Sequence, residues 1–343
     1  MKTSGTISLS EWQARFHEAE AALNQVVLGQ KSVIRLLLIC VLSRGHVLLQ
    51  GDVGTGKTTL LRALARVIGG PYARIEGTVD LLPSDLIYDA HLDEDGRPRV
   101  EPGPLLSAGE DLSVFFFNEI NRSRPQVHAL LLRLMAERSV TAFRREHHFP
   151  HIQVFADRNQ IERDETFELP AAARDRFMME IAVAAPPRRE DRIALAFETR
   201  FHDTDSLIGG LGEGILPYHA LNALSAELQK TIHASPALQR YVHDLCDALR
   251  APSEAGIRLE GVDTARMIRG GVSPRGMQAL VRAARTQAWT EGRDMVLPAD
   301  IRAVFPAVMG HRTFLAPAFE PRRDSLIPAL YAALFDRVAV PAE

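Results

Sequence analysis

The sequence predicts a three-layer α/β domain built on a parallel five-stranded sheet, followed by a small all-α domain. Three observations support this prediction. A glycine-rich phosphate-binding pattern, residues 51–58, stands between a short apolar segment and a helix-like stretch. Up to residue 208, short apolar runs alternate with helical patterns, which is typical of a parallel sheet covered by helices. Beyond that point the apolar residues keep helical spacing only.

Two helices are expected before the phosphate loop. Ser10 followed by Gln13 resembles a capping box that opens the first helix, and a second helix covers residues 32–42. Five strands are expected at residues 46–50, 72–77, 114–117, 152–156 and 177–183, with a helix at 127–137 between the third and fourth. The run Val114–Phe117 is wholly apolar, as expected of a strand buried on both faces.

The amino-acid composition changes at residues 202–214, which are rich in glycine and aspartate. We interpret this segment as a linker. Helical patterns follow at 221–232, 238–249, 277–284 and 301–308. We therefore expect a nucleotide-binding core with its N-terminal helices at residues 1–208 and a helical lid domain at 209–343.

Composition bounds the class of protein. The 343 residues are 46% hydrophobic and 24% charged, which is ordinary for a globular chain. A formal net charge of −3 argues against a protein that mainly coats nucleic acid. Cys40 and Cys246 lack metal-ligand spacing, so buried thiols in a reducing cytoplasm are expected. The N-terminus has no signal-peptide pattern, and the apolar run 36–42 is too short to cross a bilayer.

The phosphate loop indicates binding of a nucleoside triphosphate with Mg²⁺; ATP is the nucleotide implied by the family resemblance given below. Its glycines let backbone N–H groups surround phosphate oxygens at a helix N-terminus. Lys57 would reach the β- and γ-phosphates, and the Thr58 hydroxyl would ligate Mg²⁺. The residues expected to contact the nucleotide here are Asp52, Val53, Gly54, Thr55, Gly56, Lys57, Thr58 and Thr59.

The strand ending at Phe117 delivers Asn118 and Glu119 to the sheet edge where ligands bind in α/β proteins. A carboxylate at Glu119 can polarise the water that attacks the γ-phosphate. The preceding position normally holds a metal-binding aspartate, and here it is Asn118, which brings no charge. We expect weaker metal binding and slow hydrolysis, with faster turnover in Asn118→Asp.

Several segments in fixed order give the chain a close likeness to one family. They are residues 27–30, the phosphate loop, 80–85, 101–104, 118–122, 169–170 with 175–177, and 271–275. This chain resembles the MoxR family of AAA+ ATPases, in the clade with a helix-2 insert, over nearly its whole length. The hairpin patterns at 88–100, with a two-residue turn at Asp95-Gly96, and at 139–151 fit the insertions of that family; an ordinary exposed hairpin is the alternative for each.

The resemblance implies roles for further residues. Gly29 and Gln30 would lie near the adenine. Asn159 matches the sensor-1 residue that positions the attacking water, although residues 157–160 depart from the usual Thr-Gln-Asn-Pro. Arg176 matches the arginine finger that reaches a neighbouring subunit, with Arg174 as its rival, and Arg275 matches sensor 2.

The resemblance also implies a function. An oligomeric ring, most simply a hexamer, would couple ATP hydrolysis to chaperone-like remodelling or maturation of a client enzyme complex, including metal or cofactor insertion. A protein with a von Willebrand factor A domain is the implied partner. The alternative is an ATP-binding assembly switch that scarcely hydrolyses, because Asn118 replaces the aspartate. A motor on nucleic acid is disfavoured by the charge balance.

Overall fold

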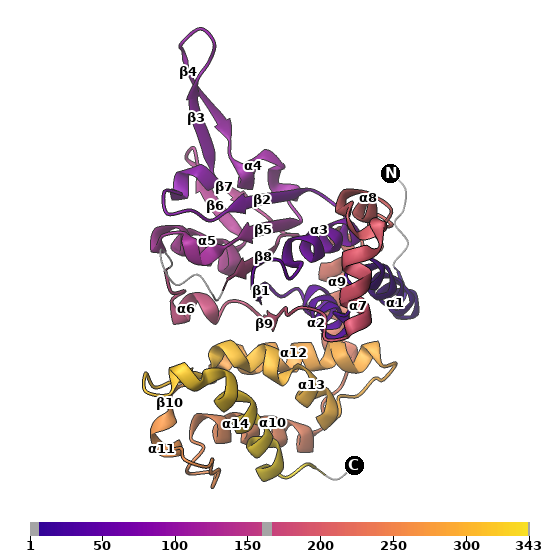
Figure 1. The fold of residues 1–343 in the computed structure, drawn as a ribbon, viewed down its shortest axis with the longest axis vertical. Coiled ribbons are helices and arrows are strands. Elements are labelled where there is room, and N and C mark those ends of the chain that lie inside the picture. Colours follow the sequence, from indigo (N-terminus) through magenta and orange to yellow (C-terminus); the bar gives the residue numbers. More distant parts are fainter. Residues whose placement is uncertain (1–6, 160–166, 342–343) are drawn as a thin grey trace. The chain divides into compact units, whose positions relative to one another are not determined.

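The computed structural model describes residues 7–159 and 167–341 (Figure 1). It divides into two compact units. The first is formed within Met1–Phe177 and Ile181–Leu224, and the second within Met178–Glu180 and Ser225–Glu343. The change from one to the other falls inside helix α9 (Leu221–Thr231). An α/β core followed by a helical unit is the predicted fold class, and it is confirmed.

The first unit is built on a five-stranded sheet in the order β2-β5-β8-β1-β9. Its strands are β1 (Val47–Gln50), β2 (Tyr72–Glu76), β5 (Val114–Asn118), β8 (Gln153–Arg158) and β9 (Met179–Ala182). β2 pairs with β5, β5 with β8, and β1 with β8, all in parallel. The carboxyl ends of these strands therefore meet at one edge of the sheet, where polar residues follow β5 and β8.

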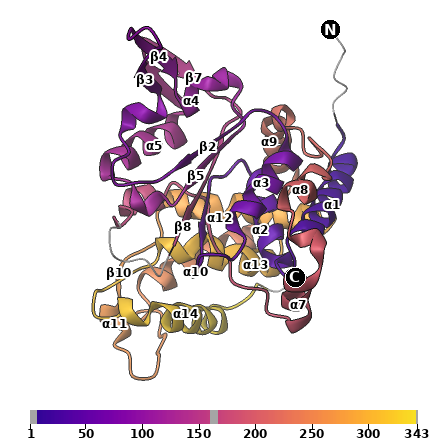
Figure 2. The ribbon, with the colours of Figure 1, turned by 45° about the horizontal axis from the view of Figure 1, so that its top comes forward.

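Helices cover both faces of this sheet. Figures 1 and 2 show α5 (Pro125–Glu137) on one side, and α1 (Leu9–Val26), α2 (Lys31–Leu42) and α3 (Lys57–Ile68) on the other. Phe115 and Phe117 of β5 are buried in one cluster with Leu131 and Leu134 of α5. Phe116, which lies on the opposite face because side chains alternate along a strand, is also fully buried. β5 is therefore packed on both faces, which holds its carboxyl end in place.

Short helices complete the first unit: α4 (Pro104–Ser107), α6 (Ala171–Arg174), α7 (Arg189–Phe197) and α8 (Thr204–Gly209). The glycine-rich segment expected to be a linker is instead ordered structure on the core. Ile208 and Leu211 are buried in it, and Arg62 of α3 pairs with Asp205 of α8 at 2.6 Å. The glycines suggested flexibility, but the apolar residues between them pack.

The N-terminal cap also differs from the prediction. The capping box is formed by Ser8 and Glu11, not by Ser10 and Gln13. The Ser8 N–H donates to Glu11 Oε2 at 2.8 Å, and the Glu11 N–H donates to Ser8 Oγ at 3.3 Å. The Glu11 carboxylate, at the third helical position, accepts the bond from the Ser8 N–H and interacts favourably with the positive end of the helix dipole. The helix therefore begins after Ser8 rather than after Ser10.

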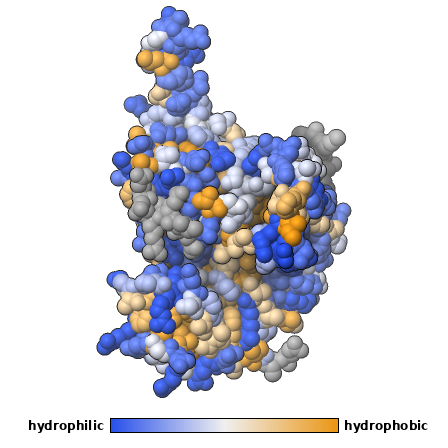
Figure 3. All heavy atoms as spheres, in the orientation of Figure 1, coloured by the Kyte–Doolittle hydropathy of each residue, from blue (hydrophilic) through white to orange (hydrophobic). Residues whose placement is uncertain are grey.

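The first unit contains two hairpins, as predicted, and the first of them projects from it (Figure 1). One joins β3 (Tyr88–Leu92) to β4 (Pro98–Pro102), and the other joins β6 (Ser139–Ala142) to β7 (Arg145–His148). The first turn is longer than the two residues predicted, because Leu92 pairs with Pro98 and the Asp93 carboxylate accepts from the Arg97 N–H at 2.9 Å. Figure 3 shows apolar atoms among hydrophilic ones on this projection, where Leu92 and Val100 are exposed.

The second unit is mainly helical. It contains α10 (Pro236–Arg250), α11 (Thr264–Met267), α12 (Pro274–Thr290), α13 (Pro298–Met309) and α14 (Arg323–Arg337). A short antiparallel pair, β10 (Ile268–Gly270) with β11 (Phe314–Leu315), was not predicted, and neither was α14. Phe305 of α13 packs edge-on against Tyr331 of α14, with ring centroids 5.2 Å apart, inside the core of this unit.

Cys40 and Cys246 are both fully buried free thiols. Burial raises the pKa of the Cys246 thiol to about 12, so it stays protonated at neutral pH. Among the residues that the structure describes, no helix is both long enough and apolar enough to span a membrane.

Candidate nucleotide and hydrolysis site

The phosphate loop connects β1 to α3, and its glycines are needed there. Gly54 and Gly56 have φ values of +80° and +85°, in the left-handed region that favours glycine. Gly51 lies against the residue that follows β9, because a Cβ built on it would be 2.1 Å from the Val183 carbonyl oxygen. The first turn of α3, which contains Thr58 and Thr59, has no side-chain cap, so its backbone N–H groups point toward the loop.

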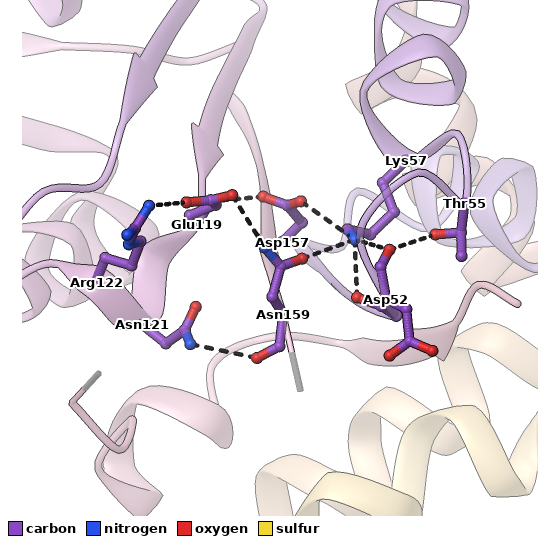
Figure 4. Close-up of polar contacts among 9 residues, drawn as sticks. Asp52, Thr55, Lys57, Glu119, Asn121, Arg122, Asp157 and Asn159 are labelled. Carbon is purple, nitrogen blue, oxygen red and sulfur yellow. Dashed lines mark hydrogen bonds and ion pairs between the residues drawn. The ribbon is translucent and has the colours of Figure 1, made fainter. Parts of the chain in front are cut away.

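Lys57 lies at the centre of a dense polar network (Figure 4). Its Nζ donates to the carbonyl oxygens of Gly51 and Asp52, both at 2.8 Å, and to Asn159 Oδ1 at 2.9 Å. The side chain is only 6% exposed. Burial lowers the pKa of the Lys57 ammonium, while the charges of Asp157 and Glu119 oppose this shift. The loop thus holds a cation at the N-terminus of α3.

Asn159 joins the phosphate loop to the carboxylate of Glu119. It follows β8 and is 9% exposed. Its Oδ1 accepts from Lys57, and its Nδ2 donates to Glu119 Oε1 at 2.9 Å. One amide therefore orients both a cation that would bind phosphate and a carboxylate that would act as a base. The sequence named all three residues, and the structure brings them together.

Glu119 has a backbone conformation that is uncommon for a side-chain-bearing residue, with φ +51°. Two contacts fix it there in addition to Asn159. Its N–H donates to Asp157 Oδ1 at 2.7 Å, and its Oε2 accepts from Arg122 Nη1 at 3.0 Å. Half-buried, with one oxygen bonded to Asn159 and the other to Arg122, the carboxylate has a defined place at the end of β5.

Asn118, the last residue of β5, is 7% exposed. Its neighbours assign the orientation of its amide. Nδ2 lies 3.0 Å from Asp157 Oδ1, and Oδ1 lies 3.2 Å from Arg74 Nη2 of β2. Asn118 therefore connects a buried carboxylate to a guanidinium.

Asp157 was not singled out by the sequence, and it is the most deeply buried acid of the site at 2% exposure. Burial raises the pKa of its carboxyl, against the hydrogen bond from Glu119 N–H and the charge of Lys57. Its Oδ2 lies 4.0 Å from Lys57 Nζ. The available signal in the sequence was an acidic residue directly after the apolar run Val154–Ala156.

The chemistry of these donors fits Mg²⁺. This hard cation prefers oxygen ligands and usually retains several waters. Thr58 presents a hydroxyl at the start of α3, and Glu119 and Asp157 present carboxylate oxygens at the ends of β5 and β8. The side-chain oxygen of Asn118 faces Arg74, so Asn118 as a metal ligand stays a prediction.

Gly29 and Gln30 lie between α1 and α2, against the segment after β9. Gly29 has φ +71°, and a Cβ on it would be 2.8 Å from Pro186 Cβ. Gln30 is buried, and its side-chain amide donates to the Ala184 carbonyl. These contacts hold the two residues in the first unit; their place near an adenine stays a prediction.

The three candidate arginines differ in exposure. Arg174 at the end of α6 is 6% exposed, whereas Arg176 is half-buried, and its Nη1 donates to the Ala172 carbonyl at 2.9 Å. Arg275 is exposed in the first turn of α12, in the second unit.

Comparison with known proteins agrees with this geometry. Residues 46–179 match the family described as "ATPase family associated with various cellular activities (AAA)", and residues 262–329 match the "AAA lid domain". Protein MoxR of Paracoccus denitrificans is 72% identical over 335 residues, covering 98% of this chain and 99% of that protein.

Two further proteins extend the likeness. Chaperone MoxR1 of Mycobacterium tuberculosis is 31% identical over 92% of this chain and 80% of its own length. A solved structure from Cytophaga hutchinsonii superposes with a TM-score of 0.82 at 29% identity, covering 97% of each chain. With a near-full-length relative at 72% identity and both AAA regions matched, this chain belongs to the MoxR family of AAA ATPases.

Proposed function

We propose that this chain is a Mg²⁺-dependent ATPase of the cytoplasm that works in a ring and remodels or matures a client enzyme complex. The observation that supports it most is the bonded chain Lys57–Asn159–Glu119. It links a cation that would bind phosphate to a carboxylate that would act as a general base, through one buried amide.

Each residue has a defined task in the proposed reaction. Backbone N–H groups of the loop and of the α3 N-terminus hold the phosphate oxygens, and Lys57 neutralises charge on the γ-phosphate. Glu119 accepts the proton of the attacking water, and Asn159 keeps that carboxylate in position. Mg²⁺, held through Thr58 and Asn118, would supply further neutralisation of phosphate charge.

Arg176 would serve as the arginine finger between subunits of a hexameric ring. Its partial exposure supports this over Arg174, whose burial ties it to its own subunit. Arg275 would act as sensor 2. A mixture of Lys57→Ala and Arg176→Ala subunits should regain part of the turnover that each variant lacks. No recovery at any mixing ratio would refute a finger that acts in trans.

The client side of the proposal rests on relatedness. One relative is named a chaperone, and the family resemblance implies a partner with a von Willebrand factor A domain and clients that need metal or cofactor insertion. Glu119→Gln should bind ATP and release little phosphate, so it would hold a client that the wild-type protein lets go. Capture should require ATP and be absent from Lys57→Ala, the matched control.

Calorimetry with ATP provides the primary test. The wild-type protein should bind ATP and ADP with measurable heat, and Lys57→Ala should not. Absence of binding by the wild-type protein would refute the proposal as a whole.

Asn118 favours a second candidate function, an ATP-dependent assembly switch. In that case nucleotide binding would drive ring assembly while hydrolysis stayed negligible. Single-turnover hydrolysis by the assembled protein separates the two. Phosphate release that depends on Glu119 supports the ATPase, and its absence despite assembly supports the switch.

A further inference from the structure

The carboxyl ends of β5 and β8 place an amide and an acid side by side. These neighbouring strands are in parallel register, with Phe117 opposite Ala156. The next residue of each strand is Asn118 on β5 and Asp157 on β8. The position where the sequence leads one to expect an aspartate thus carries an amide, and the adjacent position carries the buried acid.

Asp157 reaches the functional groups of the site directly. Its Oδ1 accepts from the Glu119 N–H at 2.7 Å and lies 3.0 Å from the Asn118 amide nitrogen. Its Oδ2 faces Lys57 Nζ at 4.0 Å. The negative charge therefore lies between the general-base candidate and the phosphate-binding ammonium, about one hydrogen bond from the amide that replaces the aspartate.

The arrangement also explains the choice of an amide at 118. Arg74 Nη2 lies 3.2 Å from the Asn118 oxygen, and Asp157 lies on the nitrogen side. An amide satisfies both neighbours, as donor to one and acceptor from the other. A carboxylate there would suit Arg74 but would stand beside a second carboxylate, and two such groups seldom both ionise.

We propose that Asp157 supplies from β8 the negative charge that β5 lacks at Asn118, and that this charge supports Mg²⁺-dependent ATP binding. The inference rests on the proposed ATP-binding function. The competing explanation is that Asp157 only holds the Glu119 backbone through its hydrogen bond. The variant Asp157→Asn separates the two explanations, because it keeps an oxygen acceptor for the Glu119 N–H and removes only the negative charge.

The test measures how strongly Mg²⁺ tightens binding of a fluorescent ATP analogue, as the ratio of Kd in EDTA to Kd in Mg²⁺. Asp157→Asn should lower this ratio by about tenfold or more, the usual effect of changing a group next to a metal site. The exchange Asn118→Asp with Asp157→Asn should restore it, because the charge returns to the adjacent strand. Faster turnover from Asn118→Asp is then expected only when Asp157 is neutralised as well.

Several results would overturn the inference while leaving the proposed function intact. One is wild-type protein that binds and hydrolyses ATP together with an unchanged ratio in Asp157→Asn. Another is equal weakening of binding in EDTA and in Mg²⁺, which would indicate a structural role, and a third is no rescue by the exchange. Asp157→Thr, whose hydroxyl can also accept the Glu119 N–H, replaces Asp157→Asn if that variant does not fold. A wild-type protein that binds no nucleotide defeats the proposed function instead.

Discussion

Replacing Asn159 with alanine tests the central network most directly. The change removes the acceptor at 2.9 Å from Lys57 Nζ and the donor at 2.9 Å from Glu119 Oε1. Lys57 keeps two carbonyl acceptors in its own loop, so ATP binding should weaken little. Glu119 keeps its contact with Arg122, but it loses the group that orients it toward the phosphate side.

The size of the effect follows from the hydrogen bond to the carboxylate. A hydrogen bond to a charged group contributes about 1.5–3 kcal/mol. If that contribution is realised in the transition state, kcat should fall by about 10- to 100-fold, since about 1.4 kcal/mol is a factor of ten. The Kd for ATP should change by less than about tenfold, because two of the three Lys57 acceptors remain.

The assay combines steady-state phosphate release with equilibrium binding of a fluorescent ATP analogue. Asn121→Ala is the matched control, because Asn121 is equally buried and its side-chain amide donates to the Asn159 backbone carbonyl at 3.4 Å rather than to Lys57 or Glu119. Wild-type kcat in Asn159→Ala would refute the reasoning. An equal loss in Asn121→Ala would show that the effect arises from the local backbone rather than from the bridging amide.

Three further predictions concern stability and the loop. Burial lowers the pKa of His128 below its usual 6.5, so the unfolded state binds more protons and stability should be lost as pH falls below that value. Urea unfolding above and below pH 6.5 should show a smaller loss in His128→Gln, and an equal loss would contradict the assignment. Gly51→Ala should abolish ATP binding in calorimetry, because its Cβ would stand 2.1 Å from the Val183 carbonyl oxygen; tight binding would mean that the loop and β9 readily separate. Asp300→Ala should cost about 2–4 kcal/mol of unfolding free energy by denaturant titration, because the buried carboxylate holds the Arg293 guanidinium through two bonds of 2.6 Å. An unfolding free energy unchanged within error would show that the Arg293–Asp300 pair contributes no more than a surface ion pair.

The sequence predicted those parts of the fold whose local pattern is compatible with a single type of structure. The glycine pattern between an apolar strand and a helix located β1 and α3, and Val114–Asn118 is the buried strand that its phenylalanines indicated. Lys57, Asn159 and Glu119 came from motif positions, and folding brings these three together because β5, β8 and the loop share one edge of the sheet.

Other features depend on information that a linear pattern does not contain. The closeness of Asp157 to Asn118 comes from the pairing of two strands that are far apart in sequence. Helix α14 was missed because Pro328 interrupts its pattern, although Leu326, Leu330 and Leu334 keep helical spacing and are buried. The glycines at residues 209–214 suggested a linker, because local composition does not show that this part of the chain packs against α3.

The inaccessibility of both native thiols has a practical consequence for studying motion. Because Cys40 and Cys246 are enclosed by their helices, a maleimide dye should leave the unmodified chain untouched. A cysteine introduced at Asp95, on the exposed turn of the β3–β4 hairpin, would then be the single labelled position, with no need to remove natural residues. A reporter placed there would test whether this hairpin contacts the client of the proposed ATPase when ATP is added, in a protein otherwise identical to the wild type.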